Sequence, residues 1–220
     1  MGYTLNFSAV WRNFDQLLQG LALSLGLAFI AILIGCVIGL VTAFGLTSKS
    51  GVVRRIAGIY VTIIRNTPIL VLVLFTFFAL PQLGLRLGKI ESFVTTLAVY
   101  SGAYLAEVFR GGLLSVPRGL HEAGLAIGLK PMQIRTSIVM PLMIRNVLPP
   151  LSSTLISLFK DTSLAAAIAV PELTYEARKI NVETFRVVET WIVASCLYVA
   201  TCSLLAALMR MVERRISIPR

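Results

Sequence analysis

Long apolar stretches without charge, separated by short basic or mixed segments, dominate the pattern of this chain. The first runs from Gln16 to Ser48, 33 residues without a charged side chain, whereas a helix needs only about 20 apolar residues to cross a bilayer. We therefore expect one tilted span over about 18–46. The same pattern recurs four times, and it predicts further spans over about 56–80, 92–114, 138–170 and 190–209.

Two of these predicted spans carry polar interruptions. The sequence RNTP at 65–68 divides the second span, and its proline predicts a kink or a locally unwound turn. The sequence KDTS at 160–163 divides the fourth span and predicts a discontinuous helix. Between the third and fourth spans, about 115–137, the chain is polar and basic, and Pro117 and Pro131 each stand where a short helix can begin. We predict an angled pair of short helices there.

These patterns together predict an all-α integral membrane fold with five transmembrane helices. The chain forms one domain over 1–220, with a core at 18–212 and the helix pair at about 115–137 between helices 3 and 4. The beginning of the chain lacks a basic region and a small-residue cleavage pattern, so we interpret the first apolar run as a true span and not as a cleaved signal.

Composition agrees with a membrane protein and argues against most enzyme classes. Hydrophobic residues make up 57% and charged residues 14% of the chain, against about 25% charged in soluble domains. Cys36, Cys196 and Cys202 all lie in apolar runs, which indicates packing residues and no disulfide framework. With one His and no phosphate-binding, metal-ligating or nucleophile motif, the chain is not expected to carry out its own chemistry or to hold a metal.

Basic residues predict the orientation. The net charge is +10, which in a membrane protein indicates basic cytoplasmic loops and no nucleic-acid partner. Twelve basic residues fall on one side of the predicted spans and six on the other, so the N-terminus is expected outside, the C-terminus in the cytoplasm, and Trp11 and Trp191 near the outer interface. The twelve are Lys49, Arg54, Arg55, Arg110, Arg118, Lys130, Arg135, Arg145, Arg210, Arg214, Arg215 and Arg220.

The polar segment at 115–137 contains a run of small side chains. Ala123, Gly124, Ala126 and Gly128 leave little bulk over two helical turns, so another surface can approach closely. The alternative is an amphipathic linker whose basic residues meet anionic headgroups of the inner leaflet. Glu122 has an alternative of its own, stabilisation of the positive end of the short helix.

A wider pattern favours the first interpretation. Glu122-Ala123-Gly124, then Gly128, then nine residues to Ile138-Val139-Met140-Pro141 resembles the EAA loop (E-A-A-x3-G-x9-I-x-L-P) of permease subunits of ATP-binding-cassette (ABC) importers. Gly124 and Met140 replace Ala and Leu, and glycine loosens a helix by up to about 1 kcal/mol. RNTP at 65–68, SGAY at 101–104, EVFRGG at 107–112 and KDTSL at 160–164 resemble the polar amino acid branch of that family, and the resemblance runs from about 19 to 215.

The resemblance implies a type I importer in the bacterial cytoplasmic (inner) membrane. It implies alternating access driven by two separate ATPase subunits, which would bind ATP and Mg, so that this chain would hold no cofactor and hydrolyse no ATP. It also implies a second permease subunit, the same or a homologous chain, an extracytoplasmic substrate-binding protein, and a polar amino acid as substrate. The residues expected to couple to the ATPase are Glu122, Ala123, Gly124, Ala126, Gly128 and Pro141.

Ionisable and polar side chains inside the spans are the candidates for the substrate pathway, because such groups cost about 2.5–3.5 kcal/mol each on insertion scales. Alternatives remain open: Arg65 pairing with Glu107 or Asp161, capping of a restarted helix by residues 161–163, and structural pairing of Glu107 with Arg110, which we favour. Tyr100 and Tyr104 are interpreted as packing residues, and His121 as a solvated loop residue. The pathway candidates are Arg65, Asn66, Thr67, Glu107, Lys160, Asp161, Thr162 and Ser163.

Two other classes of function compete with the importer. A gradient-driven secondary transporter or channel without an ATPase could also use broken helices, but no inverted repeat relates the halves of this chain. A membrane-embedded enzyme would need polar groups drawn from several spans. Gly35 and Gly39 form a small-x3-small pair that predicts close helix packing within the permease or against a second copy. The identity and charge of the transported amino acid stay open.

Overall fold

The computed structural model describes residues 3–216, without the side chains of Arg118, His121 and Ile216. The expectation for His121, and Arg220 in the charge count, therefore lie outside the described residues. Over this range every regular element is helical. Four helical stretches are long and apolar enough to cross a membrane: α2 (Phe14–Leu46), α5 (Lys89–Leu114), Pro131–Ile168 and α10 (Val187–Ile216). A bent pair raises the number to five, as predicted.

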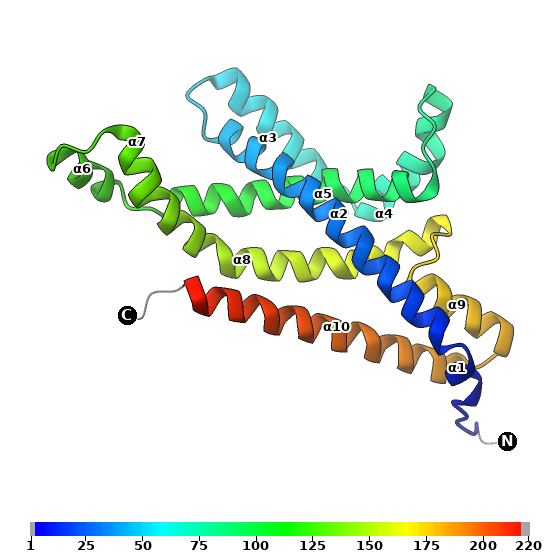
Figure 1. Cartoon of the computed structure of the whole chain (residues 1–220). Helices are drawn as coiled ribbons and strands as arrows, with labels where there is room; N and C mark the ends of the chain where they lie inside the picture. Colours follow the sequence, from blue (N-terminus) through cyan, green and yellow to red (C-terminus); the bar gives the residue numbers. More distant parts are fainter. Residues whose placement is uncertain (1–2, 217–220) are drawn as a thin grey trace.

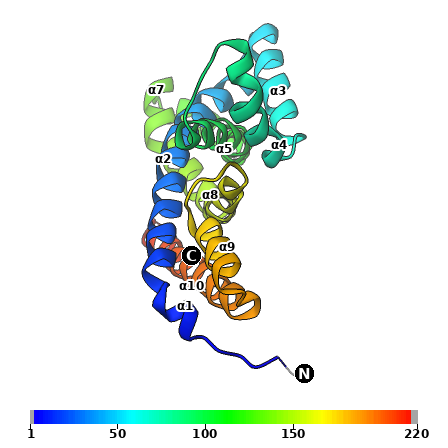
Figure 2. The same cartoon turned by 90° about the vertical axis from the view of Figure 1, so that its right-hand side faces the viewer.

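Helices α5, α8 (Met140–Asp161) and α10 lie one beside the next, and α2 crosses them (Figure 1). Seen from the side, α8 lies between α5 and α9 (Leu173–Thr184), and α2 runs along one flank (Figure 2). The first described residues and the end of α10 lie at opposite ends of the molecule (Figure 1). An odd number of crossings requires that arrangement.

Small residues bring α2 and α5 into close contact. A Cβ atom added at Gly35 would lie 1.9 Å from the Ser101 Oγ, and one added at Gly39 would lie 2.8 Å from the Leu105 Cβ. The predicted close packing at these glycines is therefore confirmed, and the partner is α5 of the same chain.

The second predicted span bends sharply at its polar interruption. Helix α3 (Gly51–Arg65) meets the stretch Ile69–Leu83 at 99°, which comprises α4 (Ile69–Leu74), a π-helix (Phe75–Ala79) and a 3₁₀-helix (Leu80–Leu83). Asn66 Nδ2 donates to the carbonyl oxygen of Thr62 at 2.7 Å, and Thr67 Oγ1 to that of Ile63 at 2.8 Å. These side chains satisfy the last turn of α3, and the following proline cannot continue it. The predicted kink is confirmed.

The fourth span differs from its prediction, because the helix does not break at residues 160–163. Helix α8 passes directly into the 3₁₀-helix η4 (Thr162–Ile168). Thr162 is fully buried and its Oγ1 donates to the carbonyl oxygen of Phe159 at 2.7 Å, within the helix. Asp161 makes no side-chain capping bond. Both the discontinuity and the capping role of residues 161–163 were therefore wrong: the polar residues tighten the helix and do not interrupt it.

Only one of the two predicted short helices is a separate element. Helix α6 (Arg118–Ala126) stands alone, whereas α7 (Pro131–Ile134) continues through a π-helix (Arg135–Val139) into α8. Pro141, at the start of α8, has no N–H to bond the preceding turn, and π-helical turns commonly absorb such a defect. The prediction of a helix pair is thus correct for α6, and α7 is the first turn of the fourth span.

Helix α9 was not predicted, since its segment reads as a mixed, charged connection. Glu172 caps it, because its carboxylate accepts bonds from Thr174 N and Tyr175 N at 2.9 Å. The same fully buried carboxylate accepts from Tyr198 OH at 3.0 Å and from Ser24 Oγ at 3.3 Å. This junction ties α9 to both α2 and α10.

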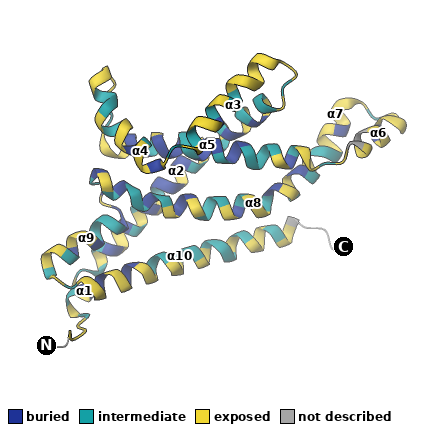
Figure 3. Cartoon of the chain, turned by 180° about the vertical axis from the view of Figure 1, so that it is seen from behind, coloured by how far each residue is buried: buried dark blue, intermediate teal, exposed yellow. Residues whose placement is uncertain are grey.

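Figure 3 shows buried residues concentrated where α2, α5 and α8 meet, and exposed residues along α3 and α10. One buried cluster joins α2, α4, α5, α8 and η4 around Phe93 and Leu97. A second joins α1 (Ser8–Arg12), α2, α9 and α10 around Leu17 and Leu173. Many apolar side chains remain exposed outside these clusters, which suits a protein whose solvent is largely lipid.

Candidate substrate pathway and coupling surface

A polar cavity of about 350 Å³ lies between α5 and α8. Tyrosines from α5 face hydroxyl-bearing residues and a carboxylate from α8 across it. Because side chains three or four residues apart share a helix face, the spacing of 153, 157 and 161 places three polar groups on one side of α8. The lining residues are Tyr100, Tyr104, Ser153, Thr154, Ser157, Leu158 and Asp161.

A second polar cavity of about 400 Å³ lies between α3 and α5, and Tyr104 lines both cavities. The guanidinium carbon of Arg65 is 5.1 Å from the centre of the Tyr104 ring, which is a favourable distance for a cation–π interaction. Tyr100 and Tyr104 lie with ring centres 4.7 Å apart and their hydroxyl oxygens 3.1 Å apart. The second cavity is lined by Val61, Thr62, Arg65, Asn66, Tyr104 and Glu107.

The tyrosine pair therefore separates a cation from a carboxylate, Arg65 in one cavity and Asp161 in the other. Tyr100 and Tyr104 were interpreted as packing residues. Tyr100 does pack against the buried cluster around Phe93 and Leu97, and both tyrosines are half-buried and also line a polar cavity. Their spacing of four residues carried a signal that the sequence reasoning missed.

Four of the pathway candidates reach these cavities: Arg65, Asn66, Glu107 and Asp161. The other four line neither cavity: Thr67, Lys160, Thr162 and Ser163.

Glu107 pairs with Arg110 and not with Arg65. The Arg110 guanidinium donates twice to Glu107 Oε2, at 3.0 Å from Nε and 2.5 Å from Nη2. The favoured structural pairing of these two residues is confirmed. Among the described residues, no ion pair joins Arg65 to Glu107 or Asp161, which leaves the Arg65 charge available to the cavity.

Sequence reasoning did not single out the hydroxyl groups of α8. Ser153 Oγ and Thr154 Oγ1 donate to the carbonyl oxygen of Pro150 at 3.0 and 2.8 Å, and both residues line the first cavity with Ser157. The signal was present as polar residues at helical spacing before Asp161. The sequence interpretation gave more weight to a predicted break at 160–163, and the structure has no such break.

Helix α6 stands at the tip of the molecule, away from the bundle of spans (Figure 1). Two small residues, Ala123 and Ala126, are exposed on it, as are Leu125 and, just beyond the helix, Ile127, the latter at 76%. Glu122 is also exposed and lies beyond the first turn, with no capping bond at the helix start. Its alternative role at the positive helix end is therefore wrong.

Two coupling candidates shape α6 from within. Gly124 is buried, and a Cβ there would lie 2.8 Å from Ile134 Cγ1. Gly128 has φ of +81°, and bonds from Gly128 N to Leu125 O and from Leu129 N to Gly124 O, both 3.0 Å, close the helix end. This is a Schellman motif, which favours glycine at that position. Both glycines therefore act through the shape of α6, and neither offers a side chain to a partner.

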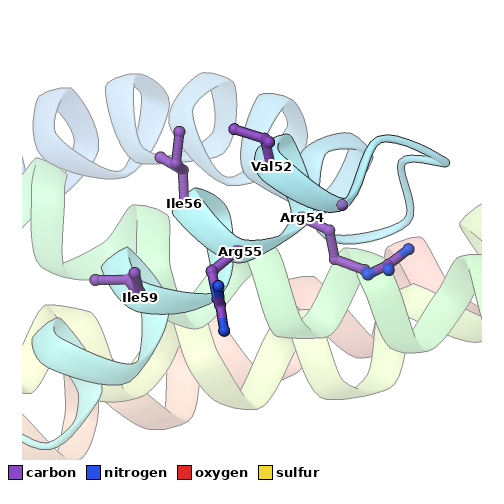
Figure 4. Close-up of a pocket in the computed structure, with 6 residues that line it drawn as sticks. Val52, Arg54, Arg55, Ile56 and Ile59 are labelled. Atoms are coloured by element: carbon purple, nitrogen blue, oxygen red, sulfur yellow. The ribbon is translucent and has the colours of Figure 1, made fainter.

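Another hollow lies elsewhere and has a different character. It measures about 680 Å³ and is lined by residues of α3 alone. Figure 4 shows Arg54 and Arg55 beside Val52, Ile56 and Ile59. Arg54 donates to the carbonyl oxygen of Ser48 at 3.1 Å. No carboxylate lines this hollow, and a surface built on one helix does not form a route between spans.

The described part of the chain contains no group of three His, Cys, Asp or Glu side chains that could hold a metal ion. The three cysteines are not joined by disulfides, and Cys196 is exposed.

Comparisons with known proteins agree with this architecture. Residues 31–218 match the family described as binding-protein-dependent transport system inner membrane component. The glutamine transport system permease protein GlnP of Escherichia coli (strain K12) is 36% identical over 215 residues, covering 97% of this chain and 98% of that protein. The L-cystine transport system permease protein TcyB of Bacillus subtilis (strain 168) is 33% identical, covering 98% and 93%.

Solved structures show the same fold. An amino acid ABC transporter crystallised with histidines superimposes with a TM-score of 0.91 at 30% identity, covering 97% of this chain and all of that one. The MetNI methionine ABC transporter in an inward-facing conformation superimposes with a TM-score of 0.80 at 21% identity, a level that supports the fold alone. By family match, sequence identity and fold, the chain belongs to the binding-protein-dependent transport system inner membrane components and is a permease subunit of an ABC importer.

Proposed function

We propose that the chain forms, with a second copy or a homologous permease, the pathway by which a polar amino acid crosses the bacterial inner membrane. Relatives that match almost the whole chain are named for glutamine and cystine transport, both polar amino acids. The chain is the conducting subunit, and two partner ATPases bind ATP and Mg and perform the hydrolysis. An extracytoplasmic binding protein delivers the substrate.

The observation that most strongly supports this function is the pair of cavities that share Tyr104. An amino acid carries a carboxylate and an ammonium group. Arg65 supplies a positive charge in the cavity on one side of the tyrosine pair, and Asp161 supplies a negative charge in the cavity on the other side. A guanidinium is suited to a carboxylate, and aromatic faces attract an ammonium group. Asn66 and the α8 hydroxyls add neutral polar groups for a side chain.

The exposed face of α6 serves as the docking surface for the ATPase. Its small residues permit close approach, and its apolar residues, Leu125 and Ile127, gain stability when covered. Because α7 continues into α8, movement of α6 reaches the helix that carries Asp161. We place α6 and the C-terminus in the cytoplasm, and the N-terminus with α9 outside, on the basis of the twelve-to-six distribution of basic residues.

The pathway role is tested by removing the Asp161 charge. Asp161→Asn keeps the shape of the side chain and is expected to lower uptake severalfold, or to alter amino acid preference, while the permease still co-purifies with its ATPase. Lys160→Gln is the matched control, since Lys160 is exposed, adjacent, and lines neither cavity. Uptake of polar amino acids unchanged in Asp161→Asn, or reduced equally in both variants, would contradict the assignment.

A further inference from the structure

A groove of about 640 Å³ lies at the α6 end of the molecule, apart from the two polar cavities. Its walls come from the ends of α2 and α5 and from the continuous stretch from α7 to α8. They are largely apolar, and three methionines contribute to them. The lining residues include Phe44, Leu114, Met132, Arg135, Met140 and Met143.

Among the described residues that line the groove, Arg135 is the only charged one. It lies in the π-helix between α7 and α8 and is exposed, and within residues 3–216 it has no ion pair or hydrogen bond from its side chain. None of the described lining residues supplies a carboxylate to neutralise it. A guanidinium with free donors in a rigid fork matches the geometry of a phosphate group.

The position of the groove defines what can fill it. Helices α2 and α5, both membrane spans, end there at Leu46 and Leu114. Apolar walls at the end of a span lie beside the acyl chains of one leaflet, and an arginine at the same end lies at headgroup depth. Methionine side chains are flexible enough to accommodate an irregular chain. The groove therefore suits a molecule with an apolar tail and an anionic head.

We propose that this groove binds an anionic phospholipid of the leaflet at the α6 end, with its phosphate on Arg135 and an acyl chain against the methionines. One wall of the groove is the π-helical joint through which α6 connects to α8. A bound lipid would therefore stabilise the π-helical connection between α6 and α8. The proposal depends on the membrane fold and not on which amino acid is transported, so it stands or falls separately from the pathway assignment.

The test uses the intact transporter, purified in mild detergent and stripped of lipid. Dioleoyl-phosphatidylglycerol is titrated and counted on the complex by native mass spectrometry, with dioleoyl-phosphatidylcholine as the neutral probe. Arg135→Gln is expected to weaken phosphatidylglycerol binding about fivefold and to leave phosphatidylcholine binding unchanged. Met140→Trp, which fills the groove, is expected to weaken both. Elution of each variant from a sizing column as an intact complex shows that it has folded.

Arg55→Gln is the matched control, because it removes a basic residue from the hollow on α3 and not from the groove. If Arg55→Gln and Arg135→Gln weakened phosphatidylglycerol binding equally, the lipid would be held by general charge attraction and not by the groove. That result would overturn the proposal. Binding unchanged in Arg135→Gln would overturn it as well. If Arg135→Gln instead weakened ATPase association in the absence of lipid, the occupant would be the ATPase, and the proposal would be wrong.

Discussion

At the scale of single residues, the glycines of α2 differ in whether a neighbouring helix packs against them. Gly35 and Gly39 set the distance between α2 and α5, because side-chain atoms of α5 occupy the space a Cβ would need. Gly26, on the same helix, has nothing within 4 Å of an added Cβ. The sequence could predict the first two from their spacing, but only the packing of α5 separates them from the third.

This contrast predicts the stability of two matched variants. Gly39→Leu forces a large side chain into the α2–α5 contact, and overpacking of this kind typically costs about 1–3 kcal/mol. Gly26→Leu extends into open space and is expected to change stability by less than about 0.5 kcal/mol. Thermal unfolding in detergent measures both. Equal melting temperatures for the two variants would show that α2 and α5 are not packed as described.

Glu172 predicts a pH dependence of stability. Burial raises the pKa of its carboxyl above the ordinary value of 4.5, although four hydrogen-bond donors lower it in part. The folded protein therefore retains a proton that the unfolded chain has released, so stability falls as the pH rises from 4.5 through the raised pKa. We expect the melting temperature to rise as the pH is lowered toward 4.5, and Glu172→Gln to flatten that slope. Glu183→Gln, exposed on the same helix, should leave it unchanged; a slope identical in all three proteins would contradict the account.

At the scale of elements, hydropathy predicted the spans well, because a bilayer demands long apolar helices whatever their tertiary contacts. The predictions from sequence were wrong where tertiary contacts determine the local structure. Helix α9 has an unremarkable mixed sequence, and it is stabilised by the contact of Glu172 with Ser24 and Tyr198, which are distant along the chain. The polar tetrad at 160–163 was read as a break, since no local pattern shows that the hydroxyl of Thr162 bonds within its own helix.

The exposed position of α6 predicts that a substitution there can disrupt coupling to the ATPase without disrupting membrane insertion. Ala123 is exposed, whereas the neighbouring Gly124 is buried against Ile134 of α7. Ala123→Arg is therefore expected to leave membrane insertion intact and to abolish both ATPase co-purification and uptake. Val182→Arg, an exposed position on α9 at the other end of the molecule, serves as the control and should retain the ATPase. Normal ATP-dependent uptake by Ala123→Arg would remove α6 from the coupling route.

At the scale of the whole molecule, the polar groups gather along α5. Tyr100, Tyr104 and Glu107 face α3 on one side or α8 on the other, and α10 is fastened to the far side of α8, where Ser152 Oγ donates to Glu213 Oε1 at 2.5 Å. The sequence supplied the charged members of this site, but its assembly depends on helices that are remote along the chain. Hydropathy alone could not have paired Arg65 with Tyr104.

The proposed function requires that ATP hydrolysis by a partner subunit drives uptake through this chain. It is tested most directly in sealed membrane vesicles that contain the complete transporter and its binding protein, by following radiolabelled glutamine with the proton and sodium gradients collapsed by ionophores. The account predicts uptake that continues while ATP and Mg are supplied on the ATPase side and stops when ATP is removed. Uptake driven by an imposed ion gradient without ATP would contradict it and would identify a gradient-driven carrier instead.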